Sequence, residues 1–241
     1  MENLSAGAFD SRLAQLYALD GRPESTDRAR ERACHVVQSF LDQFQPAGDV
    51  PAALFSGPGR TELGGNHTDH QHGRVLCGSV DLDMLACAAP NQSDVIRIQS
   101  EGYPALEISL HDLSVREEEK NTSAALVRGV AAKIQELGYT LSGFDAYAVS
   151  TVLSGSGLSS SAAYEVLIGN ILNHFCCNGA LDAIEIAKIG QYAENVYFGK
   201  PSGLMDQMGS SVGGAVAIDF AGPAAPVVDK IDYDFSGSGY A

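Results

Sequence analysis

The chain of 241 residues has no tryptophan and is poor in positive charge, with 15 Lys and Arg against 30 Asp and Glu and a formal net charge of −15. This shortage argues against duplex DNA or RNA as a partner, since binding them requires extensive neutralisation of phosphates. No apolar run approaches the roughly 20 residues of a membrane-spanning helix. The first residues, Met1–Ser5, have neither the basic region nor the apolar core of a signal peptide. We therefore expect a cytoplasmic protein without a nucleic-acid or membrane partner.

Cysteine is also sparse. The five cysteines, two of them adjacent at Cys176 and Cys177, form no C-x-x-C pair, which favours reduced thiols over a disulfide framework. Hydrophobic residues make up 45% of the chain, enough for a globular protein with one substantial core or two modest ones.

Apolar periodicity predicts four helices and five strands. The helices are expected at 26–45 after possible caps at Ser25 and Thr26, at 122–138, from near Ser160, and at about 181–198. The strands are expected at 52–57, 83–89, 94–99, 143–150 and 214–220. Because strands and helices follow no regular βαβ rhythm, the predicted class is α+β. We expect a helical lead-in over 1–50 and one domain over 51–241, and the composition from Asp232 onward suggests a chain that stops within a fold.

The most informative segment is Leu153–Ala163, in which Gly155 and Gly157 lead into Leu158, three serines and a helix-forming run. Such a segment offers backbone N–H groups, hydroxyls and the positive end of a helix dipole to a polyanion. It is not a Walker A loop, because no G-x-x-x-x-G-K-[ST] pattern occurs. The alternative is an ordinary strand-to-helix turn.

A second segment, 58–73, gathers polar side chains between glycines and a proline, so we expect a loop or a short strand and turn. These side chains are Arg60, Glu62, Asn66, His67, Asp69, His70 and His72. The three histidines leave zinc binding open, but no fourth ligand stands at a recognised spacing. A sugar-binding loop fits better, because Asp, Asn and His side chains hydrogen-bond vicinal hydroxyls.

A third segment, Glu194–Met208, holds a candidate general base. Asp206 lies between two methionines after Gly203, and an apolar surround helps a carboxylate act as a base near neutral pH. The alternative is an Asp placed at a helix start to interact with the dipole. Glu194 ends a helical pattern, where an acid needs a partner such as a cation.

Together, and in this order, the three segments resemble the GHMP small-molecule kinases, most closely the galactokinase family. Gly59–Asp69 is similar to the signature G-R-x-N-x-x-G-E-H-x-D-Y, Ser154–Ala163 to the phosphate-binding motif, and Pro201–Gln207 to the segment with the catalytic aspartate. The resemblance covers residues 52–220 and implies a fold like domain 2 of ribosomal protein S5.

The resemblance also implies site residues and two ligands, ATP and Mg²⁺. Asp206 would take the proton of the anomeric hydroxyl, and Arg60 would favour ionised Asp206 and stabilise charge during transfer. Ser161 and Glu194 would hold Mg²⁺ on the nucleotide. The phosphate cradle would comprise Gly155, Ser156, Gly157, Leu158, Ser159, Ser160, Ser161 and Ala162. The sugar pocket would comprise Asn66, His67, Asp69 and Gly203, and the adenine would lie near residues 79–92 and 122–128.

The chain departs from the family at several points. Glu62 stands where the signature has Asn, Asn66 where it has the Glu that contacts the terminal hydroxymethyl group, and His70 where it has Tyr. The family's C-terminal half is absent from this sequence. We expect the family reaction, galactose and ATP giving galactose 1-phosphate and ADP, with little activity from this chain alone. The alternatives are a kinase for another sugar, such as an N-acetylhexosamine or a pentose, and a catalytically silent sugar sensor.

Overall fold

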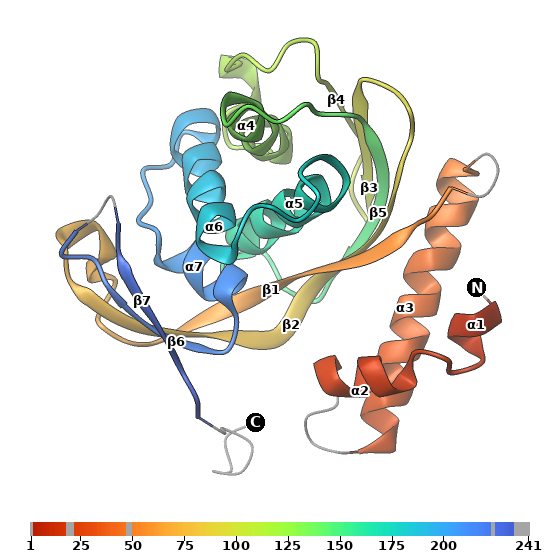
Figure 1. The fold of residues 1–241 in the computed structure, drawn as a ribbon, viewed down its shortest axis with the longest axis horizontal. Helices are drawn as coiled ribbons and strands as arrows, with labels where there is room; N and C mark the ends of the chain where they lie inside the picture. The colour runs from red at the N-terminus through yellow and green to blue at the C-terminus, as the bar shows by residue number, and fades with distance from the viewer. Residues whose placement is uncertain (1, 18–21, 47–49, 223–224, 234–241) are drawn as a thin grey trace.

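The computed structural model describes residues 2–17, 22–46, 50–222 and 225–233, and within them one curved, mixed sheet organises the molecule (Figure 1). The strand order is β4-β3-β5-β2-β6-β7, and β1 pairs with β2 off this path. The strands are β1 (Ala53–Gly64), β2 (Arg74–Pro90), β3 (Val95–Ser100), β4 (Leu106–Ser109), β5 (Phe144–Ser150), β6 (Ala215–Asp219) and β7 (Val227–Ile231). Only β3 and β5 are parallel among the described pairs.

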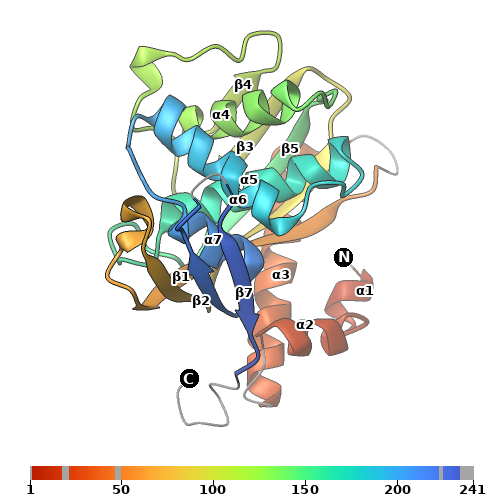
Figure 2. The ribbon, with the colours of Figure 1, turned by 60° about the vertical axis from the view of Figure 1, so that its left-hand side comes forward.

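Helices cover both faces of this sheet. In Figures 1 and 2, α4 to α7 lie on the inner side of its curve and α3 on the outer side. The helices are α1 (Glu2–Ser5), α2 (Asp10–Tyr17), α3 (Pro23–Phe44), α4 (Ser123–Glu136), α5 (Ser160–Cys176), α6 (Ala183–Tyr192) and α7 (Met205–Val212). Shorter turns are η1 (Thr68–Gln71), η2 (Glu117–Glu119) and the π-helical η3 (Ala193–Phe198).

Alternation along β2 explains why both faces are buried. Ala86 and Ala88 belong to the core cluster beneath α4 and α5, whereas Leu85 and Cys87 pack with Phe40 of α3. Successive side chains of a strand point to opposite faces, so a strand covered on both sides reads as a continuous apolar run. Helix α3, which lies within the predicted lead-in of residues 1–50, therefore packs on the sheet of the predicted domain of residues 51–241. The division between residues 1–50 and 51–241 stays a prediction.

The α+β class is confirmed, and the main elements lie near their predicted places. The first long helix begins at Pro23 rather than after Ser25 or Thr26, because proline occupies the first helical position and Arg22 is the N-cap. Strand β1 continues to Gly64 and η1 follows at Thr68–Gln71, so the segment 58–73 forms the strand and turn that were expected as the alternative to a loop. The short elements α1, α2, β4 and β7 were not predicted. The end from Asp232, where the composition suggests a chain that stops within a fold, lies mostly outside the described residues.

Candidate functional site

Arg60 and Asp206, which are 146 positions apart, meet beside α7. The Nε and Nη2 atoms of Arg60, on β1, lie 2.8 and 2.6 Å from Oδ1 of Asp206, in the first turn of α7. Close packing brings the two elements together, because a Cβ on Gly209 would come within 3.0 Å of the Arg60 Cβ. The structure thus joins the two residues predicted for catalysis, in a pair that is largely shielded from solvent.

The Gly/Ser loop is fastened to β1 by its carbonyl groups. Arg60 donates from Nη1 to the carbonyl of Gly157 at 2.7 Å and from its backbone N–H to that of Leu158 at 3.1 Å. Strand and helix approach closely here, since a Cβ on Gly57 would lie 2.2 Å from the Ala163 carbonyl oxygen. The glycine in β1 therefore marks a close backbone approach rather than a turn.

The loop leads into α5 through Ser159, which has left-handed backbone angles, φ 55° and ψ 63°. Its hydroxyl donates to Oδ2 of Asp206 and does not cap α5. The first N–H groups of this 17-residue helix therefore have no side-chain cap. Uncapped N–H groups and the helix dipole attract an anion. Both predicted functions of the loop, phosphate cradle and strand-to-helix turn, are compatible with this geometry.

Glu194, in η3, is a buried carboxylate that accepts four hydrogen bonds. Ser161 Oγ and Lys200 Nζ each lie 3.0 Å from Oε1, while Ser202 Oγ and Gln207 Nε2 lie 2.6 and 2.9 Å from Oε2. Burial disfavours the charge of Lys200, but the hydrogen bond and charge of Glu194 outweigh it, so the pKa of Lys200 is raised. Ser161 and Glu194 were predicted together. Lys200 is the cation partner that the position of Glu194 required.

Gln207 connects Glu194 to a second buried acid that sequence reasoning missed. Its Nε2 also donates to Oε2 of Glu165 at 2.9 Å, and the Oε1 atoms of Glu165 and Gln207 are buried without a hydrogen-bond partner among the described residues. Burial, and then the charge of Glu194, raise the pKa of Glu165 well above its ordinary value. One signal was available: Glu165 follows Ser161 by four residues, on the same face of α5.

On the predicted sugar side, Asp69 fixes the start of α7. Its Oδ2 accepts a hydrogen bond from the backbone N–H of Met205 at 3.1 Å, and its side chain is only 6% exposed. Gly203 lies against it, since a Cβ there would come within 1.8 Å of the same oxygen. The structure thus brings Asp69 and Gly203 into direct contact.

The neighbouring turn carries Asn66 and His67, both exposed and both left-handed, with φ of 58° and 51°. Glu62 accepts a hydrogen bond from the backbone N–H of His67 at 2.9 Å, and its other oxygen lies 3.2 Å from His67 Nε2. Across the described part of the chain, no three His, Cys, Asp or Glu residues are grouped to hold a metal ion. The zinc alternative for His67, His70 and His72 therefore receives no support.

A cavity of about 280 Å³ opens beside the N-terminus of α5. Ser160 and Ser161 border it on one side, and much of the remaining wall is apolar. Its other lining residues include Met84, Ile98, Tyr103, Leu106, Ser123, Leu126, Val152, Tyr164 and Phe198. Part of this wall, at Met84 and 123–126, coincides with the segments expected near an adenine, whereas 98–106 was not predicted.

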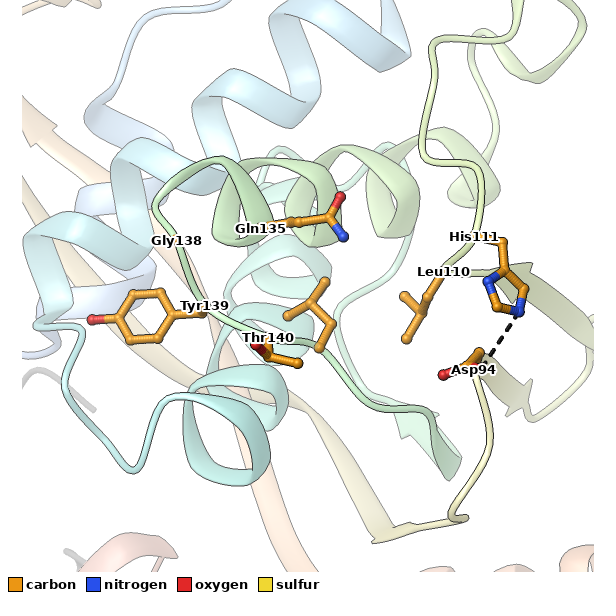
Figure 3. A pocket seen from close by; sticks show the side chains of 8 residues that line it. Asp94, Leu110, His111, Gln135, Gly138, Tyr139 and Thr140 are labelled. Carbon is orange, nitrogen blue, oxygen red and sulfur yellow. Dashed lines mark ion pairs between the residues drawn. The ribbon is translucent and has the colours of Figure 1, made fainter.

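A second cavity, of about 350 Å³, contains none of the predicted site residues (Figure 3). Asp94 and His111 form an ion pair of 3.4 Å at its rim, with both side chains more than half exposed. No helix in the described ranges combines the length and the hydropathy needed to cross a bilayer.

Two models of known protein families match stretches of this chain. Residues 125–214 match the model of the GHMP kinases N terminal domain, and residues 38–90 match the galactokinase galactose-binding signature. Over residues 125–214 the chain is therefore similar to the N-terminal domain of the GHMP kinases. The galactokinase of Clostridium tetani is 33% identical over 69% of this chain, and that of Streptomyces coelicolor is 34% identical over 68%. Both of these relatives are galactokinases.

Solved structures give the same result. A Lactococcus lactis galactokinase complexed with galactose has a TM-score of 0.74 and 25% identity, over 84% of this chain and 52% of that one. The Methanococcus jannaschii mevalonate kinase has a TM-score of 0.63 at 20% identity, over 80% of this chain and 59% of that one, and supports the fold alone. The fold expected from the resemblance is confirmed. The chain spans 42% of the length of each of the two galactokinases compared above.

Proposed function

We propose that this chain is the N-terminal part of an ATP-dependent sugar kinase that phosphorylates galactose at its anomeric hydroxyl. One observation carries the proposal: Arg60 holds Asp206 next to the uncapped N-terminus of a long helix. A base beside an anion-binding helix end is what transfer of a phosphoryl group to a hydroxyl requires, because this chemistry depends on positioning and charge stabilisation.

In the proposed reaction, Oδ2 of Asp206 accepts the proton of the anomeric hydroxyl. That oxygen now receives the hydroxyl of Ser159, so the sugar hydroxyl would take the place of a hydroxyl donor already accommodated there. The sugar oxygen then bonds to the γ-phosphorus as the bond to the ADP oxygen breaks. Arg60 keeps its two contacts with Oδ1 throughout and offsets negative charge in the transition state.

The nucleotide would lie along the loop and the start of α5. Backbone N–H groups of 155–162 would bind the phosphates, except that of Ser156, which donates to the Leu153 carbonyl. Two carbonyls of the loop are already bound by Arg60. The apolar cavity of about 280 Å³ beside Ser160 and Ser161 is then the candidate site for the adenine ring. A kinase that uses ATP would work in the cytoplasm, where the five free cysteines stay reduced.

Ser161 and Glu194 would hold Mg²⁺ on the nucleotide. Their oxygens lie 3.0 Å apart and are the hard ligands that this ion prefers. The donor set also fits in charge, because Glu194 already attracts the cation Lys200. When bound, the ion neutralises charge on the phosphates.

The proposal is tested by calorimetry with galactose and with ATP and Mg²⁺ on the 241-residue chain. Binding of both is expected, and failure to bind either would contradict the proposal. Galactose-dependent ADP release by the chain alone should be small or absent, because the chain spans only 42% of the length of the Clostridium tetani galactokinase. Robust turnover would show that this part of the proposal is wrong.

The second candidate is a kinase for another sugar, an N-acetylhexosamine or a pentose. Asn66 favours it, because a carboxamide stands where the signature has a carboxylate. Competition among these sugars and galactose in the binding assay separates the two candidates. A silent sugar sensor would have no need of the Arg60–Asp206 pair. A chain that binds galactose but does not bind ATP would favour the sensor.

A further inference from the structure

Two residues of the galactose-binding signature have exchanged places in this chain. The signature has Asn and Glu at the positions of Glu62 and Asn66, and here they are reversed. The matched model covers both positions, since it spans 38–90. One carboxylate and one carboxamide are therefore kept, in exchanged positions.

The backbone supplies a local reason for asparagine at position 66. Asn66 has φ 58°, in the left-handed region where asparagine is several-fold enriched over most other residues. Its exposed side chain lies on the turn. With the carboxylate on the strand at position 62, the turn does not have to hold a glutamate, which adopts left-handed angles less readily than asparagine.

Strand geometry places Glu62 on the face that carries the Arg60–Asp206 pair. Arg60 and Glu62 are two residues apart on β1, opposite Ser79 and Cys77 of β2 with no register shift between them. Residues two apart on a strand share a face. Cys77, directly across from Glu62, lies against α7, because its Sγ would be 3.1 Å from a Cβ on Gly209.

The surroundings of Cys77 support the same arrangement. Burial raises the pKa of its thiol to about 11, Arg60 opposes the change, and the carboxylates of Asp206, Glu62 and Asp69 add to it. All four charged groups therefore lie close enough to act on one buried sulfur. Glu62 belongs to the same charged cluster as the proposed base.

The Glu62 carboxylate is held in place but keeps acceptor capacity. Oε1 is bound by the N–H of His67 and Oε2 by its ring, and the side chain remains 20% exposed. A carboxylate has about four acceptor positions, so each oxygen can accept another hydrogen bond. Because His67 contacts both oxygens of Glu62, the carboxylate keeps a fixed orientation toward a ligand.

We propose that Glu62 is a specificity-determining residue of the sugar site, where its carboxylate accepts a hydrogen bond from one hydroxyl of a neutral sugar. This assignment rests on the proposed function and deepens it. Because an ionised carboxylate only accepts hydrogen bonds, Glu62 selects a sugar that carries a donor at that position over one that lacks it.

The test is calorimetric binding of galactose, and of deoxygalactoses that each lack one hydroxyl, to the 241-residue chain. Four proteins are compared: wild type, Glu62→Gln, the exchange variant Glu62→Asn with Asn66→Glu, and the control Glu118→Gln. Glu118 is exposed on η2, away from the signature. Gln keeps the length of Glu62 and an oxygen that can accept from His67, and the unfolding midpoint of each variant checks that it is folded.

Glu62→Gln should weaken galactose binding by roughly 10- to 100-fold, the range for a hydrogen bond to a charged group. The loss should be absent for the one deoxygalactose that lacks the recognised hydroxyl, and Glu118→Gln should bind like wild type. Recovery of galactose binding in the exchange variant would further support the assignment. If wild type binds galactose and Glu62→Gln binds every sugar within about twofold of it, the assignment is overturned alone. If wild type binds no sugar, the proposed function falls as well.

Discussion

Arg60 contacts a single oxygen of Asp206: both Nε and Nη2 lie within 2.8 Å of Oδ1. The other oxygen, Oδ2, is left to the hydroxyl of Ser159. The carboxylate is thus divided into an oxygen fixed by a cation and an oxygen that faces a neutral hydroxyl. This division suits a base, because proton transfer at Oδ2 leaves the pairing at Oδ1 intact.

Asp206→Asn should therefore remove catalysis while preserving the fold. We expect the rate to fall by about 10²- to 10⁴-fold, the contribution of a general base, with little change in KM for galactose. The measurement is galactose-dependent ADP release by a chimera in which this chain replaces the matched part of the Clostridium tetani relative. Asp229→Asn, at an exposed position of β7, is the matched control. A variant that retains a tenth of the wild-type rate would contradict the role.

The buried acid Glu165 predicts a loss of stability with rising pH. Its pKa is raised in the folded chain, first by burial and then by the charge of Glu194, above the ordinary value of 4.5. At pH values between 4.5 and the raised pKa of Glu165, the folded chain binds more protons than the unfolded chain. The contribution of protonated Glu165 to the free energy of unfolding is therefore full below pH 4.5 and is lost as the pH rises.

Glu165→Gln should abolish this pH dependence of stability, because a carboxamide stays neutral at every pH tested. Urea unfolding from pH 4.5 to 8 measures both proteins. The free energy of unfolding of the variant relative to wild type should increase steadily with pH. A constant difference would show that Glu165 is ionised alike in both states.

Tyr17 predicts a second pH dependence, in the alkaline range. Its hydroxyl donates to Oδ2 of Asp83 at 2.7 Å, and burial, followed by the charge of Asp83, raises its pKa from 10 to about 12. The contribution is full below pH 10 and is lost as pH rises to 12. With solvent screening we expect about 1 to 2 kcal/mol. The difference in unfolding free energy between wild type and Tyr17→Phe should shrink over this range, and a constant difference would refute it.

The sequence predicted those parts of the candidate site in which a local residue pattern has a single common function. The Gly/Ser loop, the candidate base Asp206 and the pair of Ser161 and Glu194 could be named from their local patterns and from the resemblance to a known family. Strand β1 was predicted too short, because glycines such as Gly57 usually indicate turns and here admit the backbone of α5. Glycine is typical both of turns and of close backbone approaches, so the sequence alone does not distinguish the two.

The donors around Glu194 could not have been predicted in the same way. Gln207 lies 13 residues from Glu194 and 42 from Glu165, and its two hydrogen bonds arise only when α5, η3 and α7 pack together. The sequence patterns assign no role to Lys200. Its ion pair with Glu194 depends on the turn after η3, which the helical periodicity of 181–198 does not specify.

Gly203 illustrates how a residue predicted to line the sugar pocket has a packing role that can be tested separately. A Cβ at this position would lie 1.8 Å from Oδ2 of Asp69, the oxygen that accepts from the N–H of Met205. Gly203→Ala should force the Asp69 side chain away and leave the start of α7 without this acceptor. We expect a loss of about 0.5 to 2 kcal/mol in the free energy of unfolding, the range for losing a helix cap.

Asp69→Ala removes the same interaction from the other side, so the double variant should lose no more than the larger of the two single losses. Urea unfolding of the three variants measures this, and Gly222→Ala is the control, because a Cβ there would meet only ordinary contacts. Additive losses would mean that Gly203 acts apart from Asp69. A shared loss would show that Gly203 and Asp69 stabilise the chain through the same contact at the start of α7.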